Sequence, residues 1–258
     1  MQIKISEESM AELRSWFANY TGRFQSDYPE MRQNMDLKIE HTRRVCDEMS
    51  YLGRQSGLTE DELRLAETIA LLHDIGRFEQ YARYRTFVDG KSKNHAELGI
   101  EIIDKYGVLD SFDDAAKDIA RRAVRYHNRP SLPPDETEAV LLFAKLIRDA
   151  DKLDIWKVLT DYYHRKEKRR NEALELDLPD TQGFSQKVYR CLMQKRIVNT
   201  KDMKNLNDFK LLQIGWIFDL NFDATLRQAK ERRYLQLIRD VLPESREIDE
   251  LFDMIEAS

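Results

Sequence analysis

Four of the five histidines lie on apolar stripes that recur at helical spacing, so each is expected to point into the protein interior. A single inward histidine is ordinarily a hydrogen-bonded core residue, because imidazole is intermediate in its preference for burial. Four inward histidines on successive segments instead indicate a metal site, since neutral imidazole is a preferred ligand of Zn, Mn, Fe, Co and Ni. The stripes are Leu37, His41, Val45, Met49 and Leu52; Leu63, Ala66, Ala70 and His73; His95, Leu98 and Ile102; and Ala116, Ala120, Ala123 and His127.

Aspartates supply the remaining ligands of this candidate site. Asp74 follows His73 directly and lies about 100° further round the helix, so both side chains reach one centre only at a frayed helix end. Gly76 lets the chain turn away at that point. The pair is therefore placed where a helix ends and the chain changes direction.

A long segment, about residues 137–165, carries three further aspartates. Its inward stripe selects Asp151, while Asp154, roughly 60° away, is the second choice. Asp149 falls on the opposite side and is expected to pair with Lys145 or Lys152 in water. Because a buried carboxylate is costly without a cation, an inward Asp151 supports the metal site.

The ordered series His41, His73-Asp74 and Asp151 resembles the HD superfamily of metal-dependent phosphohydrolases. The flanking stretches Leu72-His73-Asp74-Ile75-Gly76-Arg77 and Ala150-Asp151-Lys152-Leu153 carry the same resemblance, which covers about residues 30–165. Members of this superfamily are all-helical, and their four signature residues bind a divalent metal. The resemblance thus implies an HD-domain helical bundle with His41, His73, Asp74 and Asp151 as metal ligands.

His95 and His127 extend this signature. The stretches Asn94-His95-Ala96-Glu97-Leu98-Gly99 and Tyr126-His127-Asn128 resemble the extra histidines of two-metal HD subfamilies, including the HD-GYP cyclic-dinucleotide phosphodiesterases and the mixed-valent di-iron oxygenases. Six ligands would suit two ions bridged by Asp74. Asn128 follows His127 and no Gly-Tyr-Pro appears downstream, so cyclic di-GMP is a poor candidate substrate. The expected cofactor is one or two divalent ions per chain, chosen from Mn, Fe, Co, Ni, Zn and Mg.

The resemblance implies hydrolysis of a phosphate ester, a nucleotide foremost, by attack of metal-activated water. We expect Asp74, Arg77 and Lys152 to act in catalysis, and the phosphate to be bound by Arg77, Arg129, Lys91 and Lys93. Each cation alone is also explained as a solvated surface residue. Two alternatives stay open: a di-iron HD-type oxygenase with the same six ligands, and a non-catalytic nucleotide-sensing HD module.

The elements that position these residues are predicted to be helices throughout, because Gly (9) and Pro (6) are scarce and strand signals are nearly absent. Thr59 and Glu62 form a predicted capping box that begins a helix running to about His73. The longest non-helical stretch before residue 165 is expected at about 78–93. The other helices are expected at about 6–20, 31–53, 94–106, 113–127, 137–165, 184–196, 205–220, 223–241 and 244–256.

Two domains are expected, an HD metal-binding domain over residues 1–168 and a helical extension over 169–258 that packs on or near it. The charge run 165–170 marks the boundary between them. The extension has no acid/base cluster, so it is interpreted as a packing cap, a dimer surface or a wall of the substrate pocket. A homodimer therefore stays open.

Composition limits the class of protein. The chain has 258 residues, is 41% hydrophobic and 34% charged, and carries 42 basic against 47 acidic residues for a net charge of −5. The mild acidity argues against nucleic acid as an obligatory partner, so a small molecule is expected. No apolar run approaches the roughly 18 residues of a membrane span, and the amino terminus has no secretory pattern. The expected compartment is the cytoplasm.

Overall fold

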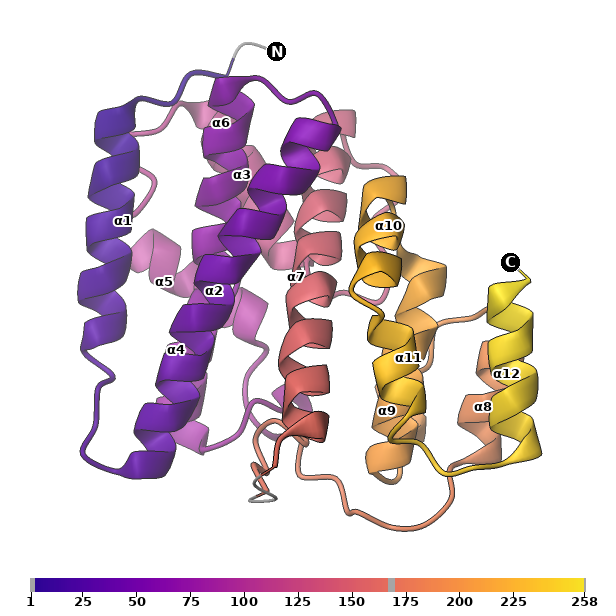
Figure 1. Ribbon diagram of the computed structural model, residues 1–258. Coiled ribbons are helices and arrows are strands. Elements are labelled where there is room, and N and C mark those ends of the chain that lie inside the picture. The colour runs from indigo at the N-terminus through magenta and orange to yellow at the C-terminus, as the bar shows by residue number, and fades with distance from the viewer. Residues whose placement is uncertain (1–2, 167–169, 258) are drawn as a thin grey trace. The chain divides into compact units, whose positions relative to one another are not determined.

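A computed structural model describes residues 3–166 and 170–257, and within these ranges the chain contains helices and no strand (Figure 1). The predicted all-α class is therefore confirmed. The α-helices are α1 (Glu7–Gly22), α2 (Pro29–Gln55), α3 (Glu60–Leu72), α4 (Ile75–Tyr84), α5 (His95–Lys105), α6 (Asp114–Tyr126), α7 (Glu138–His164), α8 (Gln186–Met193), α9 (Leu206–Gly215), α10 (Asp223–Glu231), α11 (Tyr234–Arg239) and α12 (Arg246–Glu256). Short 3₁₀ turns are η1 (Asp89–Lys91), η2 (Thr200–Asp202) and η3 (Trp216–Asp219).

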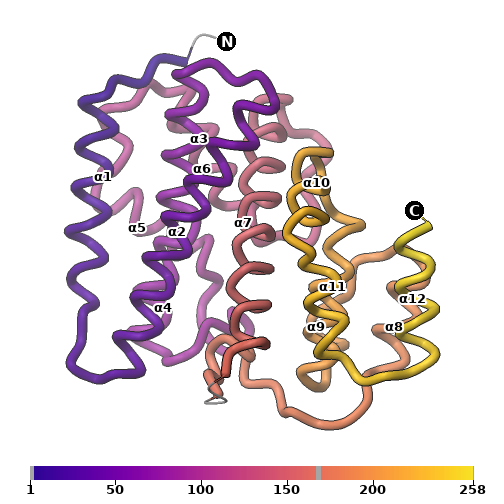
Figure 2. The backbone as a smooth tube through the Cα atoms, viewed as in Figure 1, coloured from indigo at the N-terminus to yellow at the C-terminus, as the bar shows by residue number. Residues whose placement is uncertain are grey.

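The chain forms two compact units, Met1–Asp154 and Ile155–Ser258, and the division between them falls inside α7. Figure 2 follows the backbone through both. The expected domain boundary between residues 168 and 169 lies outside the described residues. The two-domain organisation with that boundary therefore stays a prediction.

In the first unit, α3 packs against α1, α2 and α6, and α5 packs against α4 and α6. Helix α3 begins as its sequence predicts, since Thr59 and Glu62 form the complete capping box. Large apolar side chains of α2 and α3 are fully buried, and each such burial contributes roughly 1.5–3 kcal/mol to folding. They include Met35, Met49, Leu52, Leu65, Ile69 and Leu72. This core fixes the helices that carry the histidines.

The segment expected to be non-helical from residue 78 instead begins as helix α4, which continues to Tyr84. The break between α3 and α4 is confined to Asp74, whose backbone (φ −106°, ψ 15°) leaves the helical region. Ile75, Phe78 and Tyr81 are then buried at helical spacing, and this apolar stripe explains the helix. Arg85 ends it in the left-handed conformation, so the irregular loop begins seven residues later than expected.

The second unit also departs in detail from the predicted pattern. The helix expected over 223–241 is divided into α10 and α11 by Arg233, which has a left-handed backbone (φ 57°). The helix expected over 205–220 ends at Gly215 and continues as η3. The core of the second unit includes Trp156, whose indole Nε1 donates to the Gln213 carbonyl oxygen at 3.1 Å. Over the described part of the chain, the search for a helix long and apolar enough to cross a bilayer finds none.

Candidate metal centre

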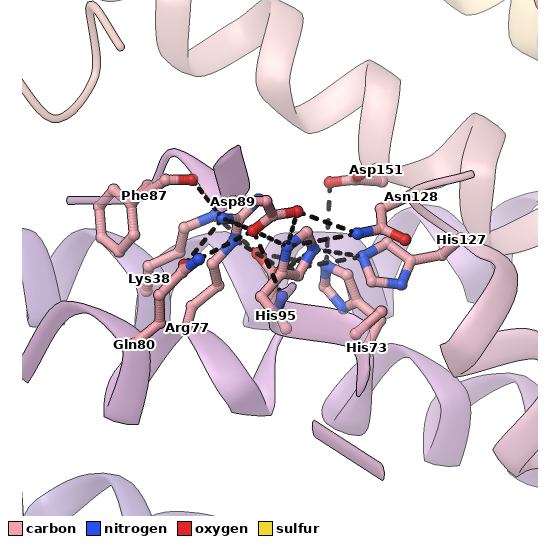
Figure 3. Close-up of polar contacts among 12 residues, drawn as sticks. Lys38, His73, Arg77, Gln80, Phe87, Asp89, His95, His127, Asn128 and Asp151 are labelled. Carbon is pink, nitrogen blue, oxygen red and sulfur yellow. Dashed lines mark hydrogen bonds and ion pairs between the residues drawn. The ribbon is translucent and has the colours of Figure 1, made fainter. Parts of the chain in front are cut away.

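The six side chains predicted as ligands converge inside the first unit, each from a helix or a helix end. Figure 3 labels four of them, His73, His95, His127 and Asp151. Five of them are at most 6% exposed, whereas the Asp151 side chain is 19% exposed. Solvent therefore reaches the cluster beside Asp151. The positions are His41 within α2, His73 and Asp74 at the junction of α3 and α4, His95 at the start of α5, His127 at the end of α6, and Asp151 within α7.

Two sets of three residues among those described could each hold a metal ion, and within each set the ligand atoms lie within 4.8 Å of one another. Group A is His41, His73 and Asp151, and group B is Asp74, His95 and His127. In group A the His41 and His73 Nε2 atoms are 3.2 Å apart. In group B the corresponding distance between His95 and His127 is 3.0 Å.

Asp74 lies between the two groups. Its Oδ2 atom is 3.5 Å from the Nε2 of His41 and 3.7 Å from that of His73. Its Oδ1 atom is 3.3 Å from the Nε2 of His95 and 3.8 Å from that of His127. One carboxylate oxygen faces each group, which is the placement expected of a bridging ligand.

The outer nitrogens of the four imidazoles all have acceptors. His73 Nδ1 donates to the Ala70 carbonyl oxygen and His127 Nδ1 to that of Val124, both at 2.7 Å. His41 and His95 instead donate to carboxylates. When an imidazole is neutral with its hydrogen on Nδ1, its Nε2 lone pair is free to bind a metal at the centre; without a metal, two such Nε2 atoms 3.0–3.2 Å apart repel unless a proton lies between them. This donor set of imidazole and carboxylate fits a divalent transition metal.

Two basic side chains contact Asp74. Lys38 Nζ donates to Oδ2 at 2.6 Å, and Arg77 Nε lies 3.4 Å from Oδ1. Burial alone would raise the pKa of Asp74, but Lys38, His73 and Arg77 hold it well below its ordinary value. Asp151 behaves similarly: burial opposes ionisation, and hydrogen bonds from His41 and His73 keep its pKa well below normal. Both carboxylates are therefore anionic at neutral pH.

The histidines of the two groups differ in their electrostatics. Burial and Lys38 lower the pKa of His41, but hydrogen bonds to Asp151, Asp154 and Asp74 outweigh them and raise it to about 10. For His95, burial and the nearby Arg77 charge lower the pKa to about 4, against the opposing effect of Asp89. Without metal, His41 is thus an imidazolium that offsets the carboxylates, while His95 is neutral.

Of the predicted phosphate anchors, Arg77 lies in the cluster, with 17% of its side chain exposed. Arg129 lies over the Tyr126 ring at 4.6 Å and 3.9 Å from a Glu97 oxygen. Lys93 donates to Glu101 at 2.6 Å, at a half-exposed position.

The other two predicted cations differ in burial. Lys91 is exposed in η1, and Lys152 is buried next to Asp151 in α7. The structure thus brings Arg77 to the ligands, and the roles expected of the remaining anchors stay predictions.

Three further polar residues belong to the site. Lys38 lies one turn before His41, so helical spacing could have identified it. Asp89 lies in the non-helical stretch expected at about 78–93, and Asp154 was the second choice on α7. The Asp154 Oδ2 atom accepts from His41 Nδ1 at 2.7 Å.

The expectation that Asp149 lies in water was wrong, because this residue is fully buried. Helix α7 buries Leu146, Ala150 and Leu153 as well as Ala144 and Ile147 of its inward stripe, so it has no solvent side at this position.

Comparison with known proteins agrees with this geometry. The model of the family described as HD domain matches residues 39–156, a range that contains all six ligands. No significant match was found among curated proteins or among solved structures. Proteins of the matched family are generally metal-dependent phosphohydrolases.

Proposed function

Because this chain belongs to the HD domain family through residues 39–156, we propose that it is a metal-dependent phosphohydrolase acting on a small phosphate ester, a nucleotide foremost. One observation carries this proposal: two buried ligand groups share the carboxylate of Asp74. His41, His73, Asp74 and Asp151 would hold one ion, and His95 and His127 would complete a second site with Asp74. A bound divalent ion supplies an activated water and offsets charge on phosphoryl oxygens.

The residues of the chain that would bind the substrate phosphate are Lys38 and Arg77. Both contact Asp74, so they add positive charge beside the ligands, and charged hydrogen bonds to a phosphate are stronger than neutral ones. The Lys38 ammonium also lies 5.4 Å from the Phe87 ring centre, and the Arg77 guanidinium 5.8 Å from it. Phe87 is buried and packs on Tyr81, which limits where the two cations can move.

Substrate would enter beside Asp151 and Asp89, the acidic residues of the site whose side chains are partly exposed (19% and 31%). A largely buried site with few basic side chains favours a small phosphate ester over a nucleic acid backbone, in keeping with the net charge of −5. We also propose that Arg129 and Lys93 contribute to binding only if they exchange Glu97 and Glu101 for substrate, and that Lys91 contributes from its exposed position in η1.

The test is phosphate release from a panel of nucleotides and sugar phosphates, under nitrogen, with Mn²⁺, Co²⁺, Ni²⁺, Zn²⁺ or Mg²⁺ added separately. We expect metal-dependent release by the wild-type chain and its loss in His73→Ala together with bound metal, because the imidazole is a direct ligand. The matched control is His164→Ala, which removes an exposed histidine of the second unit that donates to the Leu237 carbonyl oxygen. Phosphate release that His73→Ala leaves intact would exclude the proposed site.

A second candidate, a di-iron oxygenase, is favoured by group B, which adds two imidazoles to the four-residue HD signature. Elemental analysis of protein purified without added metal separates the two functions. Two iron atoms per chain together with oxygen uptake would favour the oxygenase, whereas phosphate release without oxygen favours the hydrolase. Nucleotide binding without either reaction would indicate a sensing module.

A further inference from the structure

The hydrogen bonds outside the two ligand groups follow the same pattern twice. Each group contains one histidine whose Nδ1 donates to a backbone carbonyl three residues earlier, His73 in group A and His127 in group B. Each also contains one histidine whose Nδ1 donates to a carboxylate that is not a ligand. These supporting carboxylates are Asp154 for His41 and Asp89 for His95.

Asp154 is held rigidly. Its side chain is 1% exposed, and it lies within the long helix α7. Arg44 Nε donates to its Oδ1 at 2.5 Å and Arg44 Nη2 to its Oδ2 at 3.0 Å, so a two-point ion pair fixes the carboxylate beside His41. The hydrogen bonds from His41 and Arg44 keep the pKa of Asp154 below normal despite burial, which leaves it anionic.

Asp89 is held differently. It lies in the 3₁₀ turn η1, its side chain is 31% exposed, and it serves several donors (Figure 3). Its Oδ1 atom accepts from His95 Nδ1 and Gln80 Nε2, both at 2.8 Å, and its Oδ2 accepts from Asn128 Nδ2 at 3.1 Å. Arg77 Nη1 lies 3.3 Å from Oδ1. The Asp89 carboxylate thus interacts with four side chains and is also partly exposed to solvent.

A carboxylate that accepts from Nδ1 fixes the imidazole tautomer and makes Nε2 a more basic ligand. Removing such a support typically weakens metal binding about 10- to 100-fold. Within the described part of the chain, Asp154 contacts His41 but no histidine of group B, and Asp89 contacts His95 but no histidine of group A. Each carboxylate therefore acts on one group.

We propose that Asp154 and Asp89 are positioning residues that set the metal affinities of groups A and B separately, with group B the weaker and more readily exchanged site. This inference rests on the proposed metal-dependent function. The difference in affinity follows from the two supports, because a buried, ion-paired carboxylate keeps its geometry whereas an exposed one in a turn is hydrated and shared. Asp89 would thus make occupancy of the second site sensitive to the metal supply.

The test titrates metal-free protein with Co²⁺ and follows the visible absorption of the bound ion. The wild-type chain should bind two ions in two separable phases. His127→Ala, which removes a ligand of group B, identifies the weaker phase by abolishing it. Asp89→Asn should raise the dissociation constant of that phase about 10- to 100-fold and leave the tighter phase unchanged. Asp154→Asn should weaken the tighter phase instead.

Two additional measurements separate positioning from general damage. Histidine ring ¹⁵N spectra of the Zn²⁺-loaded protein should change for His95 in Asp89→Asn and stay unchanged for His41, which loss of folding would not produce. Asp89→Glu, which restores a carboxylate, should recover part of the affinity. If Asp154→Asn fails to fold by circular dichroism, Arg44→Gln replaces it, because it withdraws the ion pair from Asp154 while keeping the carboxylate.

The outcomes distinguish this inference from the proposed function. If the wild-type chain binds two ions and Asp89→Asn leaves both affinities unchanged, the proposed role of Asp89 is wrong, whereas the metal site is still supported. Equal weakening of both phases by either variant would overturn the separate action of the two carboxylates. A wild-type chain that binds no ion, or only one, would overturn this inference; binding none would overturn the proposed function as well.

Discussion

At the scale of the residue, the proposed role of Lys38 in binding the substrate phosphate can be measured directly. Its ammonium contacts Asp74 but is not itself a ligand, so Lys38→Met should retain bound metal. The loss of a charged hydrogen bond, worth about 1.5–3 kcal/mol, should raise KM for a phosphate ester roughly 10- to 100-fold with a smaller change in kcat. Steady-state kinetics and elemental analysis on the same sample give both numbers.

The control for Lys38 is Lys157→Met, which removes an exposed lysine paired with Asp161 one turn away in α7. This variant should keep the wild-type KM. If Lys38→Met loses its metal along with activity, Lys38 supports the metal site and does not bind the phosphate, and the proposed assignment is wrong.

Cys46 gives a second prediction at this scale. Burial, with Glu67 and Asp47 nearby, raises the pKa of its thiol well above normal. Since the thiolate is the reactive form, Cys46 should be modified slowly by a thiol reagent at pH 8 in the folded protein and rapidly in urea. Peptide mapping by mass spectrometry after timed labelling measures the rate at this position. Fast labelling of Cys46 in the folded chain would contradict the raised pKa of its thiol.

The sequence identified the six side chains that converge better than the residues that support them, and the reason is physical. Helical periodicity identifies which face is buried, so His41 and Asp151 could be assigned to the interior. The same spacing places Lys38 one turn before His41, but a lysine on a helix is ordinarily solvated, so periodicity alone did not select it. Asp89 lies in a turn with no periodicity at all, so its position follows only from the packed loop.

At the scale of the element, the junction of α3, α4 and α5 determines whether the groups can meet. A Cβ atom on Gly76 would overlap the carbonyl oxygen of His95 and lie 2.7 Å from the backbone nitrogen of Gly99. Gly76→Ala should therefore push α5 away from α4, at a cost of about 1–3 kcal/mol, and displace His95 from Asp74. Urea unfolding gives the stability, and metal titration shows whether the weaker phase is lost.

Gly22→Ala is the matched control, since a Cβ at this helical glycine of α1 meets nothing within 4 Å. This substitution should leave metal binding unchanged and raise stability by about 0.4–1 kcal/mol, because alanine restricts the unfolded chain more than glycine does. A Gly76→Ala variant as stable as wild type would show that the two helices can separate without cost.

The same junction explains why α4 escaped sequence prediction. A glycine two residues after an aspartate is typical of a helix end, and the first break does occur at Asp74. The stripe Ile75, Phe78 and Tyr81 then restarts the helix at once. Two helices separated by only two residues are difficult to resolve by periodicity, because the apolar pattern continues across the break and only its angular position around the helix changes. That change of angular position is what lets His73 and Asp74 face one centre.

At the scale of the whole molecule, the ligands are spread from His41 to Asp151 along the chain, so the site forms only when the helices of the first unit are assembled. The unfolded chain offers no comparable arrangement of these six side chains. Metal binding should therefore be coupled to folding of that unit. Among the described residues of the second unit, no group of three or more potential ligands meets the same criterion, so its stability should depend less on metal.

This coupling predicts the effect of removing the metal. A free ion at about 100 times its dissociation constant stabilises the folded state by roughly 2.7 kcal/mol, which corresponds to a Tm increase of about 5–10 °C for a chain of this size. Scanning calorimetry with Mn²⁺ and then with a chelator should show this difference in the wild-type chain, and His73→Ala should abolish it. Hydrogen exchange should become slower in peptides of Met1–Asp154 and change little after residue 170. If the metal raises the Tm of His73→Ala as much as that of the wild-type chain, the ion binds adventitiously elsewhere on the chain. Such a surface-bound ion would not slow hydrogen exchange in the buried helices.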